Sequence, residues 1–600
     1  MPNKVLRMQV ELRREVDRHW LRWSLFAWVL ITAFYIWQRW PYIYWFALGD
    51  TDDNMRMMQV RAWLNGQSWY DLTQYRMDPP NGFNIHWSRI VDLPIAGLIL
   101  FFRMFTTNFW AERLAAGIAP LIPLSVVIAA LSFTVRQLIS RYAWPIAIAF
   151  MLGCTVGLVM FMPERIDHHN WQLAMLMLTV AGLADNRQIR SGMIIGLSCA
   201  VSLNIGLEML PYCAMAGAIV TLRWVWDRGD VMRLKVYALS LAGGCGIGFA
   251  AFASNANHAM RCDALTPVWL SVMLVAGALL YVLAWWNPTT RTVRLIASAV
   301  AGVAIGIAFA KVFPQCLGRP EQASPELMRI WLDNVREAKP IYKFPLRNIL
   351  PIGAIPAIGL IGTYVATWID WKRRRSLAWV PVTLFVTFAI AMLFWQVRAG
   401  PAAQLLALPG ITALAWIVVP WFLTRSSAVV RVVGAAVAVI VISGSFTGML
   451  LHWFPVDPPS KRVRTIDRAN ARCTSLPYLL QLNRYIPAGT TVFTHVDLGP
   501  RLIDTTDLNA IAGPYHRNGH AILDVHFAFM GSPDRFRRIA RLHHATVLLV
   551  CPNMSETTNY RARAPGGFYD QLAHGKVPKF LTPIKLPKKS PFRAFRIKLR

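Results

Sequence analysis

The sequence has little charge and very little acid. Only 16% of its 600 residues are charged, and 31 Asp and Glu stand against 62 Lys and Arg. It contains no P-loop, no dinucleotide fingerprint, no internal repeat and none of the Cys-x-x-Cys or Cys/His spacings that hold zinc. It therefore gives no support for a P-loop or Rossmann nucleotide enzyme or for a zinc-binding domain. Its basic start also does not resemble a cleaved signal peptide.

Apolar residues, in contrast, are abundant. They make up 55% of the sequence, and they recur in runs of about 20, the length that crosses ~30 Å of hydrocarbon. We therefore expect an α-helical polytopic membrane protein with about 13 transmembrane helices. The expected spans lie near 21–40, 110–136, 142–161, 171–186, 191–205, 208–226, 235–254, 267–286, 293–313, 347–369, 379–397, 402–422 and 430–452.

A shorter apolar stretch, 93–105, carries Arg103 and follows a polar loop. We interpret it as an interfacial helix, because counting it as a span would place Asp50 and Asp167 on opposite faces of the membrane. The loops that this topology assigns to the cytoplasm carry basic residues, as the positive-inside rule requires. We expect a bacterial inner-membrane protein with a cytoplasmic N-terminus. The basic residues concerned are Arg187, Arg190, Arg228, Arg233, Lys235 and 372–375.

After the last expected span the composition changes. Apolar runs shorten to strand-length pieces such as 491–494 and 545–550, and helix-like stretches such as 534–544 lie between them. An odd number of spans places this region outside the cytoplasm. We expect two domains, a transmembrane domain over 1–453 and a soluble periplasmic α/β domain over 454–600.

The eight cysteines divide by compartment. Four lie in apolar spans and are expected to be core residues, whereas four lie in outer segments where disulfides persist. We predict that Cys473 pairs with Cys551 and that Cys262 pairs with Cys316. The four core cysteines are Cys154, Cys199, Cys213 and Cys245.

The net charge of +31 is partly an orientation signal. The remainder, in the outer loops and the tail, suits the anionic head groups of membrane lipids or phosphorylated lipids. Nucleic acid is a poor alternative partner, because the chain contains no binding motif for it and sits in the membrane.

Two short acidic strings next to expected spans form the candidate chemical site. Gly49–Asp53 follows the first span and Asp167–His169 follows the third. Charge at a bilayer boundary is costly, so acids there are functional candidates. Carboxylate oxygens bind hard divalent cations, and borderline metals accept imidazole as well. If both strings lie on one side, Asp50, Asp167 and His169 can hold one divalent metal, Mg or Mn, with positions open for phosphate and water.

The order of these strings resembles the catalytic subunit of oligosaccharyltransferase, within the GT-C class of membrane glycosyltransferases. In that family the first outer loop opens with a catalytic Asp, followed by Arg, Gly, Trp and Asp positions. Asp50, Arg56, Gly66 and Trp69–Asp71 follow a similar course. The second loop of archaeal members carries Asp-His-His, as Asp167–His169 does here.

The resemblance implies roles for further residues. Val335–Pro340 is similar to the family's fifth-loop string and puts Glu337 at its Glu position. It implies that Asp50 and Glu337 are catalytic, beside the metal ligands named above. Arg398 is the nearest candidate for the family's Arg that contacts the lipid diphosphate. We expect six residues to bind substrate: Asp52, Arg56, Arg398, Asp497, His516 and Arg517.

Each of these positions also has a plainer interpretation. The first acidic string suits a solvated helix N-cap, since Asp is favoured there, and the second suits an interfacial cap. Glu337 fits a solvated acid in a charged loop, and Arg398 fits an Arg that snorkels to the interface. His516 and Arg517 fit a surface turn, and Glu208, near a span end, is an acid with no evident partner.

The chain departs from the family at the C-terminal signature Trp-Trp-Asp-Tyr-Gly. His495–Gly499 takes its place, so that Asp497 is kept while His495 and Val496 replace both tryptophans. In the family those tryptophans help to hold the Ser or Thr of the glycosylation sequon. Imidazole and valine do not form the same aromatic wall, and we expect donors suited to sugar hydroxyls or a phosphate instead. We therefore predict that Asn-x-Ser/Thr peptides are poor acceptors.

The sequence thus predicts a metal-dependent, inverting membrane glycosyltransferase. Its donor would be a sugar or oligosaccharide on a polyprenyl phosphate or diphosphate, and its acceptor an envelope glycan, lipid or protein. The rival is a non-enzymatic transporter of lipid-linked glycans. Transporters usually show inverted repeats and interrupted helices at the midplane, whereas here the unusual acids lie at loop edges.

Overall fold

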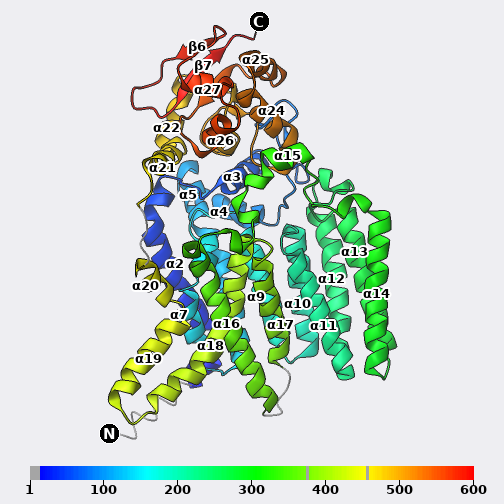
Figure 1. The fold of residues 1–600 in the computed structure, drawn as a ribbon. Helices are drawn as coiled ribbons and strands as arrows, with labels where there is room; N and C mark the ends of the chain where they lie inside the picture. The colour runs from blue at the N-terminus through cyan, green and yellow to red at the C-terminus, as the bar shows by residue number, and fades with distance from the viewer. Residues whose placement is uncertain (1–13, 373–377, 454–457, 600) are drawn as a thin grey trace.

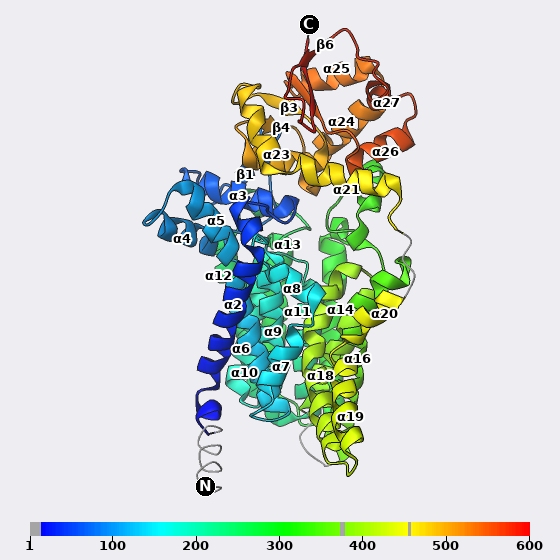
Figure 2. The ribbon, with the colours of Figure 1, turned by 90° about the vertical axis from the view of Figure 1, so that its left-hand side faces the viewer.

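The computed structural model describes residues 14–372, 378–453 and 458–599. Helices run side by side as a bundle, and a smaller domain that contains a sheet sits at one end of it (Figures 1 and 2). The predicted domain boundary after residue 453 and the basic run at 373–375 fall on residues outside this description.

Helices occupy every position at which the sequence predicts a span. An apolar helix satisfies its own backbone hydrogen bonds, which a lipid environment demands. The helices are α2 (Trp20–Tyr44), α5 (Asn108–Ile118), α6 (Leu121–Leu138), α7 (Trp144–Met151), α8 (Thr155–Leu158), α9 (His169–Ala184), α10 (Gln188–Ile205), α11 (Leu210–Trp226), α12 (Val231–Phe252), α13 (Pro267–Trp286), α14 (Arg291–Val312), α16 (Leu346–Lys372), α17 (Trp379–Leu393), α18 (Gly400–Leu423), α19 (Ala428–Ile442) and α20 (Phe446–Trp453).

Seven of the described helices are long and apolar enough to cross a membrane, and nine spans result if each of two bent pairs counts as one. The bends measure 77° between α7 and the segment Thr155–Phe161, and 82° between α19 and α20. The apolar helix α17 is shorter, at 15 residues. The helical polytopic class is therefore confirmed, and the count of 13 stays a prediction.

The first outer loop folds into a layer between the bundle and the C-terminal domain. It contains α3 (Thr51–Leu64), the short antiparallel pair β1 (Thr73–Gln74) and β2 (Phe83–Asn84), and α4 (Asp92–Arg103). α4 contacts α3 and α5 at the end of the bundle that faces the C-terminal domain (Figure 2). The stretch expected to be interfacial is thus a separate helix that lies across this end of the bundle.

The C-terminal domain is α/β, as predicted. Its five-stranded sheet has the order β4-β3-β5-β7-β6, in which β3 is parallel to β4 and β5 while β7 is antiparallel to β5 and β6. The strands are β3 (Thr491–Phe493), β4 (Asn509–Ala510), β5 (Val547–Val550), β6 (Leu581–Ile584) and β7 (Arg593–Ile597). The helices are α21 (Lys461–Cys473), α22 (Leu476–Leu480), α23 (Gly499–Thr505), α24 (Gly519–Met530), α25 (Pro533–Leu542), α26 (Ser555–Arg563) and α27 (Phe568–Ala573).

Both predicted disulfides are present. Cys262–Cys316 joins the segment after α12 to the segment after α14, and Cys473–Cys551 joins the end of α21 to the end of β5. The four cysteines predicted to be core residues are buried free thiols.

Polar contacts fix the C-terminal domain on the first outer loop. Arg76 donates to the carbonyls of Thr506 and Leu508, both at 2.6 Å. The Arg61 guanidinium pairs with Asp504 at 2.9 Å. Arg501 donates to the carbonyl of Phe46 at 2.8 Å. These contacts place the domain directly above the loop that carries the first acidic string.

Candidate functional site

Asp50 caps helix α3. Its Oδ1 accepts from the backbone N–H of Asp52 at 2.9 Å, and Asp53 Oδ2 accepts in return from the N–H of Asp50 at 2.9 Å. This reciprocal capping box satisfies donors that a helix start leaves free. The Asp50 side chain is nevertheless 47% exposed, so solvent reaches this carboxylate although it caps the helix.

The two acidic strings meet through Arg165 and Asp53. One Arg165 nitrogen donates to Asp50 Oδ2 and also to Asp53 Oδ2, the latter at 2.9 Å. Asp53 Oδ1 accepts from the backbone N–H of Asp167 at 2.9 Å. Burial opposes the charge on Arg165, but Asp53 and Asp50 outweigh it and raise the pKa of the guanidinium. Sequence reasoning did not assign a role to Arg165 and treated Asp53 only as a helix cap.

Asp167 carries an oxygen that is buried and without a partner. Its Oδ1 accepts from the N–H of His168 at 2.6 Å, whereas Oδ2 makes no hydrogen bond among the described residues. His169 Nε2 lies 3.4 Å from that oxygen. Burial raises the pKa of Asp167, but His168 and His169 outweigh it and hold the pKa well below its usual range.

These observations fit a divalent cation. A buried orphan carboxylate oxygen is costly, and a metal would satisfy it. Carboxylate oxygen suits hard cations such as Mg and Mn, and borderline metals such as Zn accept the imidazole nitrogen as well. The described residues contain no preassembled cluster of three or more such ligands.

Glu208, which the sequence left without a partner, pairs with His168. Glu208 Oε1 lies 3.1 Å from His168 Nε2, and Glu208 Oε2 accepts from Gln172 at 2.7 Å. Burial lowers the pKa of His168, but Asp167 and Glu208 outweigh it and raise the pKa to about 10. A charged imidazole therefore stands behind Asp167 and holds it in place.

Of the implied substrate-binding residues near this cluster, Asp52 lies in the first turn of α3 and Arg56 lies behind it. Arg56 is fully buried, pairs with Asp92 at 2.9 Å, and stacks over the Trp87 ring with a 4.2 Å separation from its centroid. Its guanidinium thus faces the interior of the first outer loop.

Glu337 and Arg398 form a second, more open pair. Glu337 lies in the short turn η6 (Arg336–Ala338) and Arg398 in η8 (Val397–Ala399), and their charged groups are 3.1 Å apart. Their side chains are 64% and 39% exposed. Within the described residues, no direct hydrogen bond or ion pair links this pair to Asp50 or Asp167.

We expected His495 to help present hydrogen-bond donors to sugar hydroxyls or a phosphate. That expectation is wrong, because the imidazole does not face solvent. His495 is fully buried beside Phe529, and its Nε2 accepts from the N–H of Cys551 at 3.1 Å. Burial lowers its pKa to about 3. Asp497 is exposed, in a turn whose backbone N–H groups donate to Glu556. Asp497 alone of this string faces outward.

His516 and Arg517 form polar contacts that hold the C-terminal domain on the loops of the transmembrane part. Both pair with Asp263 at 2.7 Å, and Arg517 donates in addition to Asn84 at 3.0 Å and Asn257 at 2.8 Å. The Arg517 side chain is only 4% exposed. Burial raises the pKa of Asp263, but Arg517 and His516 outweigh it and hold the pKa well below its usual range.

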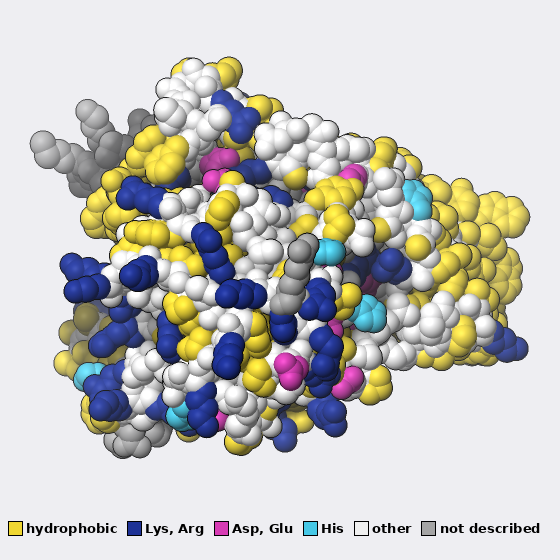
Figure 3. All heavy atoms as spheres, turned by 90° about the horizontal axis from the view of Figure 1, so that it is seen from above, with side chains coloured by type: hydrophobic (Ala, Val, Ile, Leu, Met, Phe, Trp, Pro, Cys, Tyr) yellow, Lys and Arg dark blue, Asp and Glu magenta, His cyan; other side chains and the backbone are white. Residues whose placement is uncertain are grey.

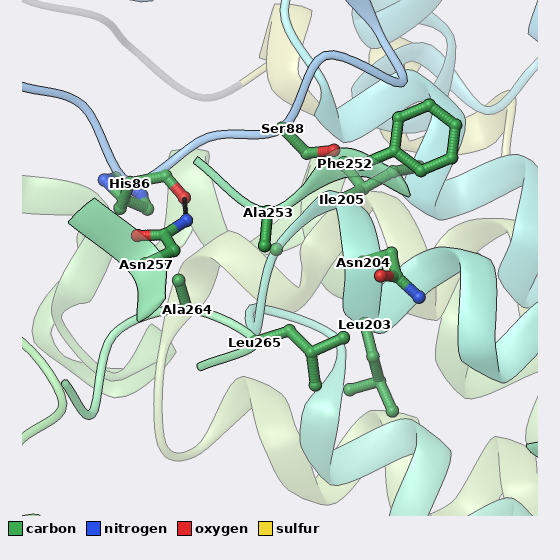
Figure 4. A pocket seen from close by; sticks show the side chains of 11 residues that line it. His86, Ser88, Leu203, Asn204, Ile205, Phe252, Ala253, Asn257, Ala264 and Leu265 are labelled. Carbon is green, nitrogen blue, oxygen red and sulfur yellow. Dashed lines mark hydrogen bonds between the residues drawn. The ribbon is translucent and has the colours of Figure 1, made fainter. Parts of the chain in front are cut away.

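A small pocket with both polar and apolar lining residues lies next to these contacts (Figure 4). His86 and Ser88 of the first outer loop face Asn204 at the end of α10 and Asn257, whose amide donates to the carbonyl of His86 at 3.4 Å. Three separate segments of the chain therefore line this pocket.

Comparisons with known proteins give matches among solved structures. No protein-family model matches the sequence, and no curated protein matches it at a significant level. The archaeal oligosaccharyltransferase AglB from Archaeoglobus fulgidus, in complex with an inhibitory peptide and a dolichol-phosphate, superposes with a TM-score of 0.67 and 15% identity. That match covers 95% of this chain and 73% of that chain.

Two further structures of the Archaeoglobus fulgidus enzyme are also similar. The one tethered to an acceptor peptide with the NVT sequon gives a TM-score of 0.63 at 14% identity, covering 91% of this chain and 71% of that chain. The complex with Zn and sulfate gives 0.58 at 14% identity, covering 91% and 69%. At such identity the similarity establishes architecture, and the chain therefore has the fold of the archaeal oligosaccharyltransferase AglB.

Proposed function

We propose that this protein is an inverting, metal-dependent GT-C glycosyltransferase of the bacterial inner membrane. It moves a sugar or oligosaccharide from a polyprenyl phosphate or diphosphate to an envelope glycan, lipid or protein acceptor, with its C-terminal domain in the periplasm. The AglB structures with a dolichol-phosphate and with an acceptor peptide support a lipid-linked donor and a separate acceptor.

One observation carries the proposal. The acidic strings around Asp50 and Asp167 come from distant parts of the chain, yet Asp53 and Arg165 join them directly. The cluster lies at the bundle end, below the C-terminal domain, and not at the middle of the helices. That position suits transfer at a membrane surface better than transport through a midplane site.

The metal would be held by Asp50, Asp167 and His169. When bound, a divalent ion supplies Lewis-acid stabilisation of the charge that builds on the leaving phosphate. The Zn and sulfate complex of AglB supports a cation site in this fold. The identity of the ion as Mg or Mn rests on the preference of carboxylate oxygens for hard cations.

The residues around the metal ligands have separate tasks. Asp53 is a scaffold, because its buried carboxylate accepts from both strings at once. Arg165 holds Asp50 and presents a guanidinium to an arriving phosphate. Glu337 with Asp50 orients or deprotonates the acceptor nucleophile, and Arg398 binds the donor phosphate. Attack opposite the leaving group inverts the anomeric carbon.

The acceptor is a glycan or lipid in preference to a peptide sequon. The turn that carries Asp497 has His495 and Val496 buried behind it, so it offers no exposed aromatic wall for a Ser or Thr side chain. An Asn-x-Ser/Thr peptide offered with the native lipid-linked donor should therefore remain largely unmodified. Efficient glycosylation of that peptide would contradict this preference and would indicate that the protein glycosylates proteins.

The test is complementation of a deletion strain. Mass profiles of envelope glycans, lipids and proteins should reveal a product that is lost on deletion and restored by the natural gene. Asp50→Ala and Asp167→Ala should abolish this product although the protein still folds. Asp507→Ala, a surface carboxylate of the C-terminal domain that bonds Asn483, is the matched control and should restore it. Full restoration by either site variant would refute the metal site.

A further inference from the structure

The pole of the C-terminal domain farthest from the bundle is strongly basic, as the view from above shows (Figure 3). Segment 576–598 contains eight Lys or Arg and no Asp or Glu, and all eight side chains are exposed. Helix α25 adds Arg535, Arg538 and Arg541, which are also exposed. We refer to these exposed Lys and Arg of α25 and of 576–598 as the basic pole.

Backbone contacts make the basic pole one surface. Arg537 of α25 donates to the carbonyl of Lys598 at 3.0 Å, and Arg541 donates to the carbonyl of Leu599. Strand β7 pairs with the edge strand β6, which sets Arg596 opposite Thr582. The cations of the helix and of the β6–β7 hairpin therefore share one rigid support.

The cations of this surface far outnumber its acids, since Asp534 is the only Asp or Glu within α25 and 576–598. None of the ion pairs between the described residues includes a cation of the basic pole, and the nearby Asp570 pairs with Arg561 and His574. Like charges within a Debye length of roughly 8–10 Å repel one another and destabilise a compact domain. Such a surface is suited to a partner that carries several negative charges.

We propose that the basic pole binds a polyanionic glycan bearing phosphate or carboxylate groups, and that this glycan is the acceptor. The acceptor assignment rests on the proposed function, whereas the binding does not. Across 533–599, the only large apolar side chains that are exposed are Leu542 and Val577. Without exposed aromatic rings the surface lacks the stacking platforms on which single-stranded nucleic acids depend.

The arrangement of the cations also favours a charged polymer. They follow helix α25, the segment before β6, the connection 585–592 and strand β7, and they do not converge on one pocket. Spaced cations match the repeated charges of a polymer better than a single anion. The basic pole also points away from the protein's own bundle (Figures 1 and 2), so the head groups of its own membrane lie out of reach.

The binding experiment uses the full-length protein in detergent micelles, with dextran sulfate and neutral dextran of equal length as probes. Dextran sulfate should bind with an affinity that falls as salt rises, and neutral dextran should not bind. Lys585→Glu with Lys588→Glu and Lys589→Glu should weaken binding by at least about tenfold, because each reversal replaces attraction with repulsion. The matched control is Lys461→Glu with Arg462→Glu and Arg464→Glu, an equal charge change on α21 at the bundle side, which should weaken binding less than about twofold.

The other outcomes overturn the inference. Equal losses in both triple variants, or no binding of dextran sulfate, would show that the charge is diffuse and forms no site. Tighter binding of duplex DNA or of anionic lipid vesicles through the same lysines would assign another occupant.

A transfer assay separates this inference from the proposed function. The triple lysine variant should raise KM for the acceptor and leave kcat unchanged. An unchanged KM would refute the acceptor assignment. If the natural protein binds dextran sulfate but transfers no sugar, the proposed function fails and the binding surface stands.

Discussion

Arg165 is the residue that most changes the interpretation of the site. The Asp50 carboxylate is fully occupied, since Oδ1 caps α3 and Oδ2 accepts from Arg165. A divalent ion can use Oδ2 only if it displaces the guanidinium. Metal binding and Arg165 therefore compete for one oxygen, and the displaced guanidinium is then free to meet a phosphate.

This competition predicts a gain of metal affinity. Arg165→Met removes the competing cation, so Mn²⁺ should bind at least about fivefold more tightly, as expected when a charge a few ångströms away is lost. Electron paramagnetic resonance of free Mn²⁺ measures this directly. Arg190→Met, which breaks a comparable pair with Asp185 on the opposite side of the bundle, should leave Mn²⁺ affinity unchanged. Unaltered affinity in Arg165→Met would show that the guanidinium does not compete.

Arg56 allows the implied substrate role to be separated from a structural one. Its guanidinium is buried between Asp92 and Trp87, and removing one partner of a buried ion pair costs about 3–5 kcal/mol. Arg56→Met should therefore lower the thermal midpoint of the protein even without substrate. Glu112, which pairs with Arg61 at a partly exposed position, offers the control Glu112→Gln with a smaller loss. A variant of Arg56 with normal stability and weakened donor binding would favour the substrate role.

At the scale of elements, the Cys473–Cys551 disulfide joins α21 to the sheet of the C-terminal domain. It closes a loop with a sequence separation of 78, and a loop of that size contributes about 4 kcal/mol in the chain-entropy model. Cys473→Ser with Cys551→Ser should therefore lower the free energy of unfolding of this domain by a few kcal/mol. Peptide mapping under non-reducing conditions checks the pairing, and detection of both thiols free would contradict it.

The elements that depend on local pattern were predictable from the sequence. Long apolar runs gave helices at every expected span because such a run forms a helix wherever it lies in lipid. The two disulfides followed from the compartment of four cysteines. The strands near 491 and 547 followed from short β-branched and apolar runs between helix-like stretches.

The contacts that build the site depend on packing between distant segments. Glu208 meets His168 across 40 positions, and Asp53 meets Asp167 across 114. No local pattern specifies such pairs. His495 was misjudged for the same reason, since the rings that bury it belong to helices further along the chain. Arg165 had one usable signal, a cation inside an acidic string at a span boundary.

At the scale of the whole molecule, the C-terminal domain is held over the site by polar contacts with the first outer loop. His543 is one of them, because its Nδ1 lies 2.8 Å from Asp78 of that loop and its Nε2 lies 2.9 Å from Asp524 of α24. Burial lowers the pKa of His543, but the hydrogen bonds that its ring donates to Asp524 and Asp78 outweigh burial and raise the pKa to about 9. A charged imidazole thus connects the two domains.

The raised pKa of His543 makes the stability of the folded protein depend on pH in a definite direction. The folded pKa lies above the ordinary value of about 6.5, so the stabilisation is fully present below that value and is lost as pH rises through about 9. The thermal midpoint of the full-length protein should therefore decrease as the pH rises from about 6.5 to about 9. His543→Gln keeps a polar side chain without the charge, so its midpoint should start lower, by at least about 2 °C, and show less of that fall. His520→Gln, at an exposed position of α24, is the control and should behave like the natural protein. Parallel pH curves for His543→Gln and the natural protein would show that the imidazolium does not hold the domains together.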